Sequence, residues 1–283
     1  MSLADHLRDE LAAAGRCDAD QLNIGETALA LAAAMKPGAA RAPYRRHLES
    51  LAGEVAAYVG GHRGSVPVAL RHEALVQVIH KRFGYVGTED CFDDIEAASL
   101  MRVIDRRGGL PVAIGVLYLH AARHAGWAAT GVDFPGRFLL RLDPDSELNA
   151  NRIIFDPFDG GRQLGPPDLR RMLKAMAGPD AELNPVHYRK AGPRAVLLRL
   201  QNNIKIRHLD AQRPGAALRV LETMVALAPD DAALWREVGV LHARLDQIPD
   251  AVAALEECLR HDGSEQTRYS TSALLQELRG RLG

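Results

Sequence analysis

The stretch ALRVLETMV at residues 217–225 returns as AVAALEECL at residues 251–259, and these two segments decide how the last third of the chain folds. Alanine, leucine and glutamate occupy matching places in both. Each matched pair, such as Ala217 and Ala251, lies 34 positions apart. Apolar residues recur at helical spacing within each segment, so both segments are expected to be amphipathic helices.

The same period extends upstream and defines two complete units. Three apolar residues precede three others by 34 positions: Leu200, Ile204 and Ile206 come before Leu234, Val238 and Val240. A 34-residue helix-turn-helix period is that of tetratricopeptide repeats. We therefore expect two repeats, at about residues 196–229 and 230–263, ending at Pro229 and Gly263. A final amphipathic stretch from about residue 268 to 282 would cover the exposed face of the last hairpin.

The first hundred residues also have a helical pattern. Apolar residues at helical spacing predict helices over residues 28–35, 44–59, 68–83 and 95–104, with glycine and proline at the breaks. Residues 84–94 (GYVGTEDCFDD) are expected to form a loop.

The middle of the chain mixes a helix with extended segments. The helix is expected to begin near Pro111, which suits a first turn, and to end at Gly126. Three extended segments follow, over residues 128–134, 137–142 and 152–156. The second and third of these are predicted to form an antiparallel hairpin.

Composition excludes several classes of protein. Lys and Arg total 35 against 36 for Asp and Glu, so no overall field favours nucleic acid or an acidic membrane. The N-terminus carries charges where a signal peptide needs an apolar core, and the longest apolar run, residues 28–35, is too short to span a bilayer. Three scattered cysteines, Cys17, Cys91 and Cys258, fit a reducing compartment. We expect a soluble cytoplasmic protein that binds neither membrane nor nucleic acid.

Three strings in the middle segment together carry a resemblance to a known family. They are RRGGLPVAIGVLYLHAARHAGW, GVDFPGRFLLR and FDPFDGG, within residues 106–161. They resemble the bacterial SirB-type branch of the transglutaminase-like superfamily, whose members typically end in tetratricopeptide repeats. The resemblance covers roughly residues 83–161 well and extends loosely across the repeats, notably at Asn202 and Asn203. It implies a papain-like core, in which a helix carrying a cysteine nucleophile packs on a small antiparallel sheet that supplies His and Asp.

The triad implied by this resemblance is degenerate here. Its Cys position falls at about Pro111, its His position (usually written PGHFL) at Arg137, and its Asp position at Asp156. Proline has no nucleophilic atom, and a guanidinium with a pKa above about 12 cannot act as a general base. Losing the nucleophile alone costs on the order of 10⁶ in turnover in a comparable triad. No catalytic residues are therefore expected. Arg137 begins one strand of the predicted hairpin and Asp156 ends its partner, so antiparallel pairing brings them to the same end, and we predict an ion pair between them. In the alternative, Arg137 points to solvent beside Arg141 and Asp156 only caps a turn.

Other chemistry-bearing residues have weaker patterns. Cys91 lies beside acidic residues, which raise rather than lower a thiol pKa. His120 and His124 have the i, i+4 spacing of a zinc pair but no evident third ligand, so we expect a solvated face. The basic pairs at residues 106–107 and 170–171 are expected at solvated surface or helix ends. The glycines match no nucleotide fingerprint, and neither a cofactor nor a metal is expected.

These observations predict an α+β protein, mostly helical. Its three parts are a helical N-terminal region (residues 1–105), a transglutaminase-like core (106–190), and two repeats with a capping helix (191–283). The first functional hypothesis is a non-catalytic module that binds a protein or peptide, with Arg137, Asp156, Asn202 and Asn203 as binding residues. The second is a papain-like amide hydrolase or acyl transferase with a displaced nucleophile. A third, a transcriptional regulator, gains no support from the neutral charge.

Overall fold

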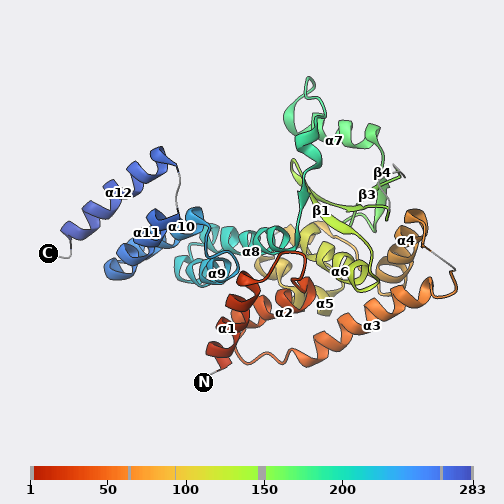
Figure 1. Cartoon of the computed structure of the whole chain (residues 1–283), viewed down its shortest axis with the longest axis horizontal. Helices are drawn as coiled ribbons and strands as arrows, with labels where there is room; N and C mark the ends of the chain where they lie inside the picture. The colour runs from red at the N-terminus through yellow and green to blue at the C-terminus, as the bar shows by residue number, and fades with distance from the viewer. Residues whose placement is uncertain (1–2, 63–64, 93, 146–150, 262–263, 282–283) are drawn as a thin grey trace. The chain divides into compact units, whose positions relative to one another are not determined.

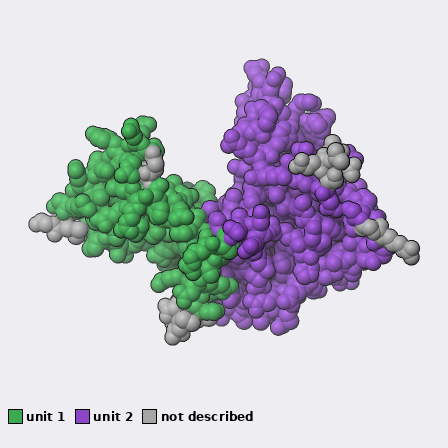
Figure 2. All heavy atoms as spheres, in the orientation of Figure 1, with its two compact units in different colours: residues 1–17, 34–37, 201–283 green, residues 18–33, 38–200 purple. Residues whose placement is uncertain are grey.

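The computed structural model describes residues 3–62, 65–92, 94–145, 151–261 and 264–281. Gly263 and part of the loop over residues 143–151 lie outside these ranges. The chain divides into two compact units (Figure 2): residues 18–33 and 38–200 form one, and residues 1–17, 34–37 and 201–283 the other. The three-part division expected from the sequence stays a prediction.

The larger unit contains a five-stranded antiparallel sheet with strand order β4-β3-β2-β1-β5. The strands are β1 (Ala129–Phe134), β2 (Arg137–Leu142), β3 (Ile153–Asp156), β4 (Arg162–Leu164) and β5 (Lys190–Ala191). The predicted pairing of β2 with β3 is confirmed, with Leu140 opposite Phe155. Strands β1 and β2 form a second hairpin, turning at Gly136 with φ +70°. Strands β4 and β5 were missed because two or three residues are too few for a period of two to show.

Helix α6 (Pro111–His124) is the central helix of this unit, as predicted. It packs on β1 and β2, and α3, α4 and α5 also contact it. Leu117 is fully buried, and ten of the 14 residues of α6 are buried. The apolar stripe in the sequence predicted that one face of α6 would be buried. More of the helix is buried than that, because other elements cover it on several sides. At Gly115 a Cβ would lie 2.5 Å from the ring of Phe138, so glycine allows α6 to approach the sheet closely.

The opposite face of the sheet is covered by α7 (Pro166–Ala177). One apolar cluster joins the sheet to α7; its buried members are Val132, Phe134, Leu139, Leu164, Leu169 and Leu173. The sheet therefore has two apolar faces, one against α6 and one against α7.

Helices from the first hundred residues complete the larger unit (Figure 1). They are α2 (Ile24–Met35), whose residues up to Ala33 belong to this unit, α3 (Ala42–Tyr58), α4 (Val68–Leu75), which continues as a π-helix (Val76–Arg82), and α5 (Leu100–Arg106). The helix predicted over residues 95–104 is wrong in its first part. Ile95–Ala98 is a short 3₁₀ helix capped by the side chain of Asp94, and Ser99 is extended before α5 begins. The expected loop before it includes a 3₁₀ turn, Glu89–Phe92.

The smaller unit contains the helical repeats. Its helices are α1 (Leu3–Arg16), α9 (Pro214–Leu227), α10 (Ala232–Arg244), α11 (Ile248–His261) and α12 (Glu265–Gly280), with the part of α8 (Pro193–Asp210) that begins at Gln201. The predicted hairpins are confirmed as helices, and Ala217 and Ala251 are fully buried.

The capping helix is also confirmed. Leu275 and Leu278 of α12 pack with Ile248, Ala251 and Leu255 of α11. At the other end of the unit, α1 packs on α9, a contact that the sequence pattern did not predict. Among the described residues, no helix is both long enough and apolar enough to cross a bilayer.

Candidate functional site

Asp156, at the end of β3, is held by the turn that follows it. Its side chain is only 1% exposed. The backbone N–H of Phe158 donates to Oδ1 at 2.9 Å, and the N–H of Gly161 donates to the backbone carbonyl of Asp156 at 2.9 Å. Gly160 and Gly161 have φ of +59° and +81°, a left-handed conformation that glycine adopts without strain. The local sequence thus fixes the carboxylate in place.

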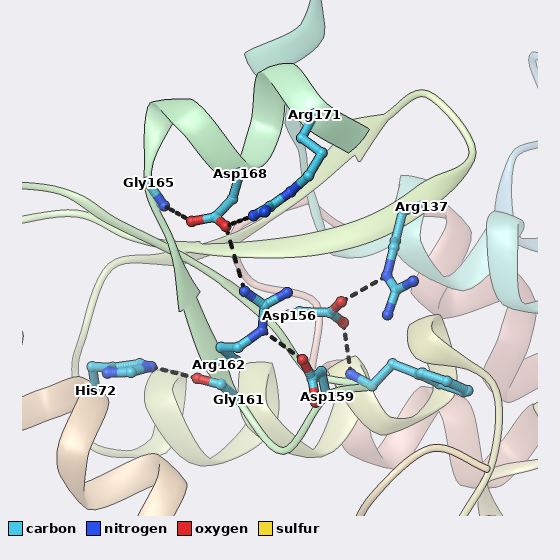
Figure 3. A network of polar contacts seen from close by, with 10 residues as sticks. His72, Arg137, Asp156, Asp159, Gly161, Arg162, Gly165, Asp168 and Arg171 are labelled. Carbon is cyan, nitrogen blue, oxygen red and sulfur yellow. Dashed lines mark hydrogen bonds and ion pairs between the residues drawn. The ribbon is translucent and has the colours of Figure 1, made fainter. Parts of the chain in front are cut away.

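Arg137, the first residue of β2, donates from Nε to Oδ2 of Asp156 at 2.6 Å (Figure 3). The predicted ion pair is therefore confirmed. The guanidinium carbon lies 5.5 Å from the centre of the Phe158 ring, at cation–π distance. The Arg137 side chain is 39% exposed. Nε is its only nitrogen with a hydrogen bond to a described residue. No described residue therefore accepts a hydrogen bond from either Nη group.

Two further residues, His72 and Tyr118, lie against the turn that follows Asp156. The Nε2 of His72 lies 2.8 Å from the backbone carbonyl of Gly161. The hydroxyl of Tyr118, on α6, is buried and has no hydrogen-bond partner among the described residues. A Cβ at Gly161 would lie 3.1 Å from that hydroxyl. Burial, and then the negative charge of Asp156, raise the pKa of Tyr118. Burial lowers the pKa of His72, and its contact with Gly161 partly offsets this.

Sequence reasoning missed these supporting residues. His72 lies 89 positions before Gly161, and no local pattern links the two. Tyr118 was assigned correctly to the apolar face of α6, but its position near Asp156 depends on how α6 packs on β3.

An exposed chain of ion pairs lies beside the site (Figure 3). Arg162 contacts Asp159 at 2.5 Å and Asp168 at 3.6 Å, and Arg171 also pairs with Asp168. The side chain of Arg171 is exposed, as expected for the basic pair at residues 170–171. Because these groups are solvated, each pair contributes little to stability.

The other basic pair departs from expectation at Arg107. Its Nη1 donates to the hydroxyl of Tyr85 at 2.5 Å and lies 2.8 Å from Nε2 of His47. The backbone of Arg107 is left-handed, with φ 57°. Arg107 is half-buried, and its guanidinium contacts an aromatic hydroxyl and an imidazole. We therefore assign it a structural role. Burial, and then the charge of Arg107, lower the pKa of His47.

Cys91 lies closer to the site than its position in the sequence suggests. It is 9% exposed and lines a cavity of about 400 Å³ with the arginines at positions 102, 106 and 107. The ring of the next residue, Phe92, is 5.5 Å from the ring of Phe158, on which Arg137 stacks. The Sγ atom of Cys91 is 3.1 Å from the hydroxyl of Thr88, which is no general base at neutral pH.

The solvated face expected for the histidine pair is correct for His124 and wrong for His120. His124 is exposed. His120 is half-buried against α2, where a Cβ at Gly25 would lie 2.5 Å from its Nδ1. Burial, and then the charge of His124, lower the pKa of His120. No group of three potential metal ligands of the His, Cys, Asp or Glu types occurs among the described residues.

Asn202 and Asn203 belong to the smaller unit, whereas Arg137 and Asp156 belong to the larger one. Both asparagines are half-buried on α8. The backbone carbonyl of Asn203 accepts a hydrogen bond from Arg207 at 3.0 Å.

Comparisons with known proteins agree with this architecture. A model of the transglutaminase-like superfamily matches residues 42–202. The chain belongs to the transglutaminase-like superfamily. A tetratricopeptide-repeat model matches residues 204–276, in agreement with the 34-residue period.

Several bacterial relatives resemble this transglutaminase-like chain over most of their length. A UPF0162 protein of Pseudomonas aeruginosa is 30% identical over 221 residues, which cover 78% of each chain. One from Xylella fastidiosa is 28% identical over 199 residues, covering 68% of each. Protein SirB1 of Salmonella typhimurium is 25% identical over 206 residues, which cover 71% of this chain and 75% of that protein. The resemblance to the SirB-type branch is thereby confirmed.

Proposed function

We propose that this transglutaminase-like chain is non-catalytic and binds a protein or peptide partner through its core site and its helical repeats. The observation that carries the proposal is the ion pair between Arg137 and Asp156 at two of the three positions where an active relative would hold its triad.

The chemistry of the three positions supports a non-catalytic role. Pro111 has no nucleophilic atom, and a guanidinium such as that of Arg137 carries hydrogen-bond donors and no acceptor, so it cannot serve as a general base. Both carboxylate oxygens of Asp156 accept hydrogen bonds, one from Arg137 and one from the Phe158 N–H. The aspartate therefore stabilises an arginine instead of orienting an imidazole.

The surface around Arg137 has the composition of a binding site. Its Nη donors lie beside Phe158, and the neighbouring side chain of Phe92 is 52% exposed. On α7, Met176 is 62% exposed, and a Cβ at Gly136, next to Arg137, would lie 2.5 Å from its sulfur. Arginine and aromatic side chains dominate the binding energy of protein interfaces. We therefore assign the core site to Arg137, Phe92 and Met176, with Asp156 positioning the guanidinium.

The repeats are proposed to supply a binding surface of their own. Stacked helical hairpins present an extended face that suits recognition of proteins and peptides. We assign Asn202 and Asn203 to this surface, because they resemble residues of the SirB-type branch. We further propose a cytoplasmic location, because none of the three cysteines forms a disulfide.

The position of Cys91 favours the enzymatic alternative as a second candidate function. Cys91 immediately precedes Phe92, which contacts Phe158 beneath Arg137. A papain-like hydrolase or acyl transferase with a displaced nucleophile would use this thiol.

One experiment separates the two functions. The full-length chain is used to capture partners from a bacterial lysate, in parallel with Arg137→Gln, Phe92→Ala and, as a control with an exposed side chain beside the site, Arg171→Gln. Reduced capture of the same partner by the first two variants and unchanged capture by the third is expected. In a second arm, the chain is assayed for incorporation of a fluorescent amine into casein. Activity that disappears in Cys91→Ala would establish the enzyme and overturn the proposal.

A further inference from the structure

A cavity of about 600 Å³ lies on the α7 side of the sheet, apart from the Arg137 site. Its floor is formed by Arg141, Ile154 and Leu164, which lie opposite one another on three neighbouring strands. Residues directly opposite in adjacent strands share a face, so the three side chains point into the same layer. Leu169 of α7 and Leu183, which follows α7, complete much of the wall.

The lining of this cavity is mostly apolar, and the charged residues among its described lining are two arginines, Arg141 and Arg152. A cavity of this size, apolar with a few polar groups, is typical of small-molecule sites. Because no acidic residue is among the described residues that line it, the charge of this lining favours an anion.

The two arginines differ in their hydrogen bonds and ion pairs. Arg141 is 11% exposed and donates from Nε to Oδ1 of Asp143 at 2.6 Å. Lys190 lies 3.0 Å from Oδ2 of the same carboxylate, so Asp143 already serves two cations. Arg152 is exposed and has no hydrogen bond or ion pair with any described residue. Among the residues that the structure describes, this positive charge at the cavity therefore has no counter-charge.

We propose that this cavity binds a small aliphatic carboxylate, with its carboxylate on the guanidinium of Arg152 and its alkyl chain on Ile154, Leu164 and Leu183. The planar guanidinium can donate two parallel hydrogen bonds to a carboxylate. The apolar residues of the lining remove an alkyl chain from water, and a purely polar anion would gain nothing from them. This site is separate from the peptide-binding surface proposed above, and neither proposal depends on the other.

The test measures binding of octanoate to the full-length, methyl-labelled chain by NMR, with octan-1-ol and acetate as matched ligands. Octanol keeps the chain without the charge, and acetate keeps the charge without the chain. Saturable shifts of the Ile154 and Leu183 methyl signals are expected with octanoate. Octanol and acetate should each bind about tenfold more weakly or worse, since a hydrogen bond to a charged group and the buried chain each contribute at least that factor.

Two variants and a control locate the site. Arg152→Gln should weaken octanoate binding about tenfold or more, and Leu183→Glu, which places a carboxylate against the alkyl chain, should abolish it. Arg170→Gln removes an exposed arginine of α7 that does not line the cavity, and it should bind octanoate like the original chain. Both binding variants alter partly or fully exposed positions, so folding is checked by the unchanged remainder of the methyl spectrum.

The proposal is overturned if octanoate gives no saturable shift at Ile154 and Leu183. It is equally overturned if octanol binds as tightly as octanoate, or if Arg152→Gln and Arg170→Gln lose affinity to the same extent.

Discussion

Arg137 and Asp156 form an ion pair in which the two partners differ greatly in exposure: the aspartate side chain is 1% exposed and the arginine 39%. They lie 19 positions apart, on β2 and at the end of β3. Because the carboxylate is buried and the guanidinium reaches solvent, losing the arginine leaves a negative charge inside the protein. Losing an exposed pair leaves both groups in water.

Arg137→Ala is therefore expected to destabilise the larger unit by more than about 1 kcal/mol, beyond the range of exposed pairs. The free energy of unfolding is measured by urea denaturation. Arg171→Ala, which removes a 74% exposed arginine beside the same site, should leave the unfolding midpoint unchanged. A midpoint for Arg137→Ala that equals that of the original chain would reject a structural role for the pair.

Leu117→Ala tests the central position of α6. The side chain is fully buried, so removing it leaves a cavity and should lower the free energy of unfolding by about 2–5 kcal/mol. Val186→Ala serves as the control, because Val186 is 44% exposed and its loss should change stability by less than about 0.5 kcal/mol. Equal effects of the two substitutions would contradict this packing.

Two glycines of the repeat unit make a matched pair. A Cβ at Gly239 would lie 2.7 Å from the side chain of Leu255, whereas one at Gly215 would meet nothing within 4 Å. Overpacking typically costs about 1–3 kcal/mol, which outweighs the gain of about 1 kcal/mol in helix propensity from alanine. Thermal unfolding should show Gly239→Ala to be less stable than the original chain, and Gly215→Ala to be equal or slightly more stable. The reverse order would disprove the close approach of α10 to α11.

The lowered pKa of His120 predicts that the folded protein loses stability at mildly acidic pH. Burial, and then the charge of His124, lower its pKa in the folded chain, while the unfolded value stays near about 6.5. The unfolded state therefore takes up the proton first as the pH falls. This contribution to stability is complete above about pH 6.5 and declines as the pH falls toward the folded pKa.

His120→Gln should accordingly flatten the change in unfolding free energy between about pH 8 and pH 5.5. A residual slope is expected, because burial also lowers the pKa of His47 and His72. His124→Gln should flatten it less, since it removes only the second cause. An unchanged slope in His120→Gln would refute this assignment.

Cysteine reactivity tests the absence of a catalytic thiol. Cys91 is 9% exposed and Cys258 is fully buried, so both should react slowly with iodoacetamide at neutral pH, as buried thiols do. Cys17 is half-exposed and should react first. Mass spectrometry of the labelled chain gives the order directly, and rapid stoichiometric labelling of Cys91 at about pH 6 would revive the enzymatic alternative.

Much of the fold follows from local sequence patterns. The 34-residue period placed Ala217 and Ala251 at equivalent buried positions, because a repeat must bury the same face each time. The apolar spacing after Pro111 identified α6, although not how completely it is enclosed. Arg137 and Asp156 were paired from the triad positions that the resemblance implies and from the order of two extended segments, since antiparallel strands bring the start of one to the end of the next.

The tertiary structure alone decided which distant groups meet. His72 reaches Gly161, Arg107 binds Tyr85 and His47, and Phe92 packs on Phe158 through contacts between segments far apart in the chain. Periodicity reports which face of an element is buried, but not which other element covers it. The sequence by itself determined α6, the repeats and, through the family resemblance, the degenerate triad. The surroundings of Cys91, the half-burial of His120 and the cavity beside Arg152 arose only when those elements packed, because each depends on side chains that converge from several elements.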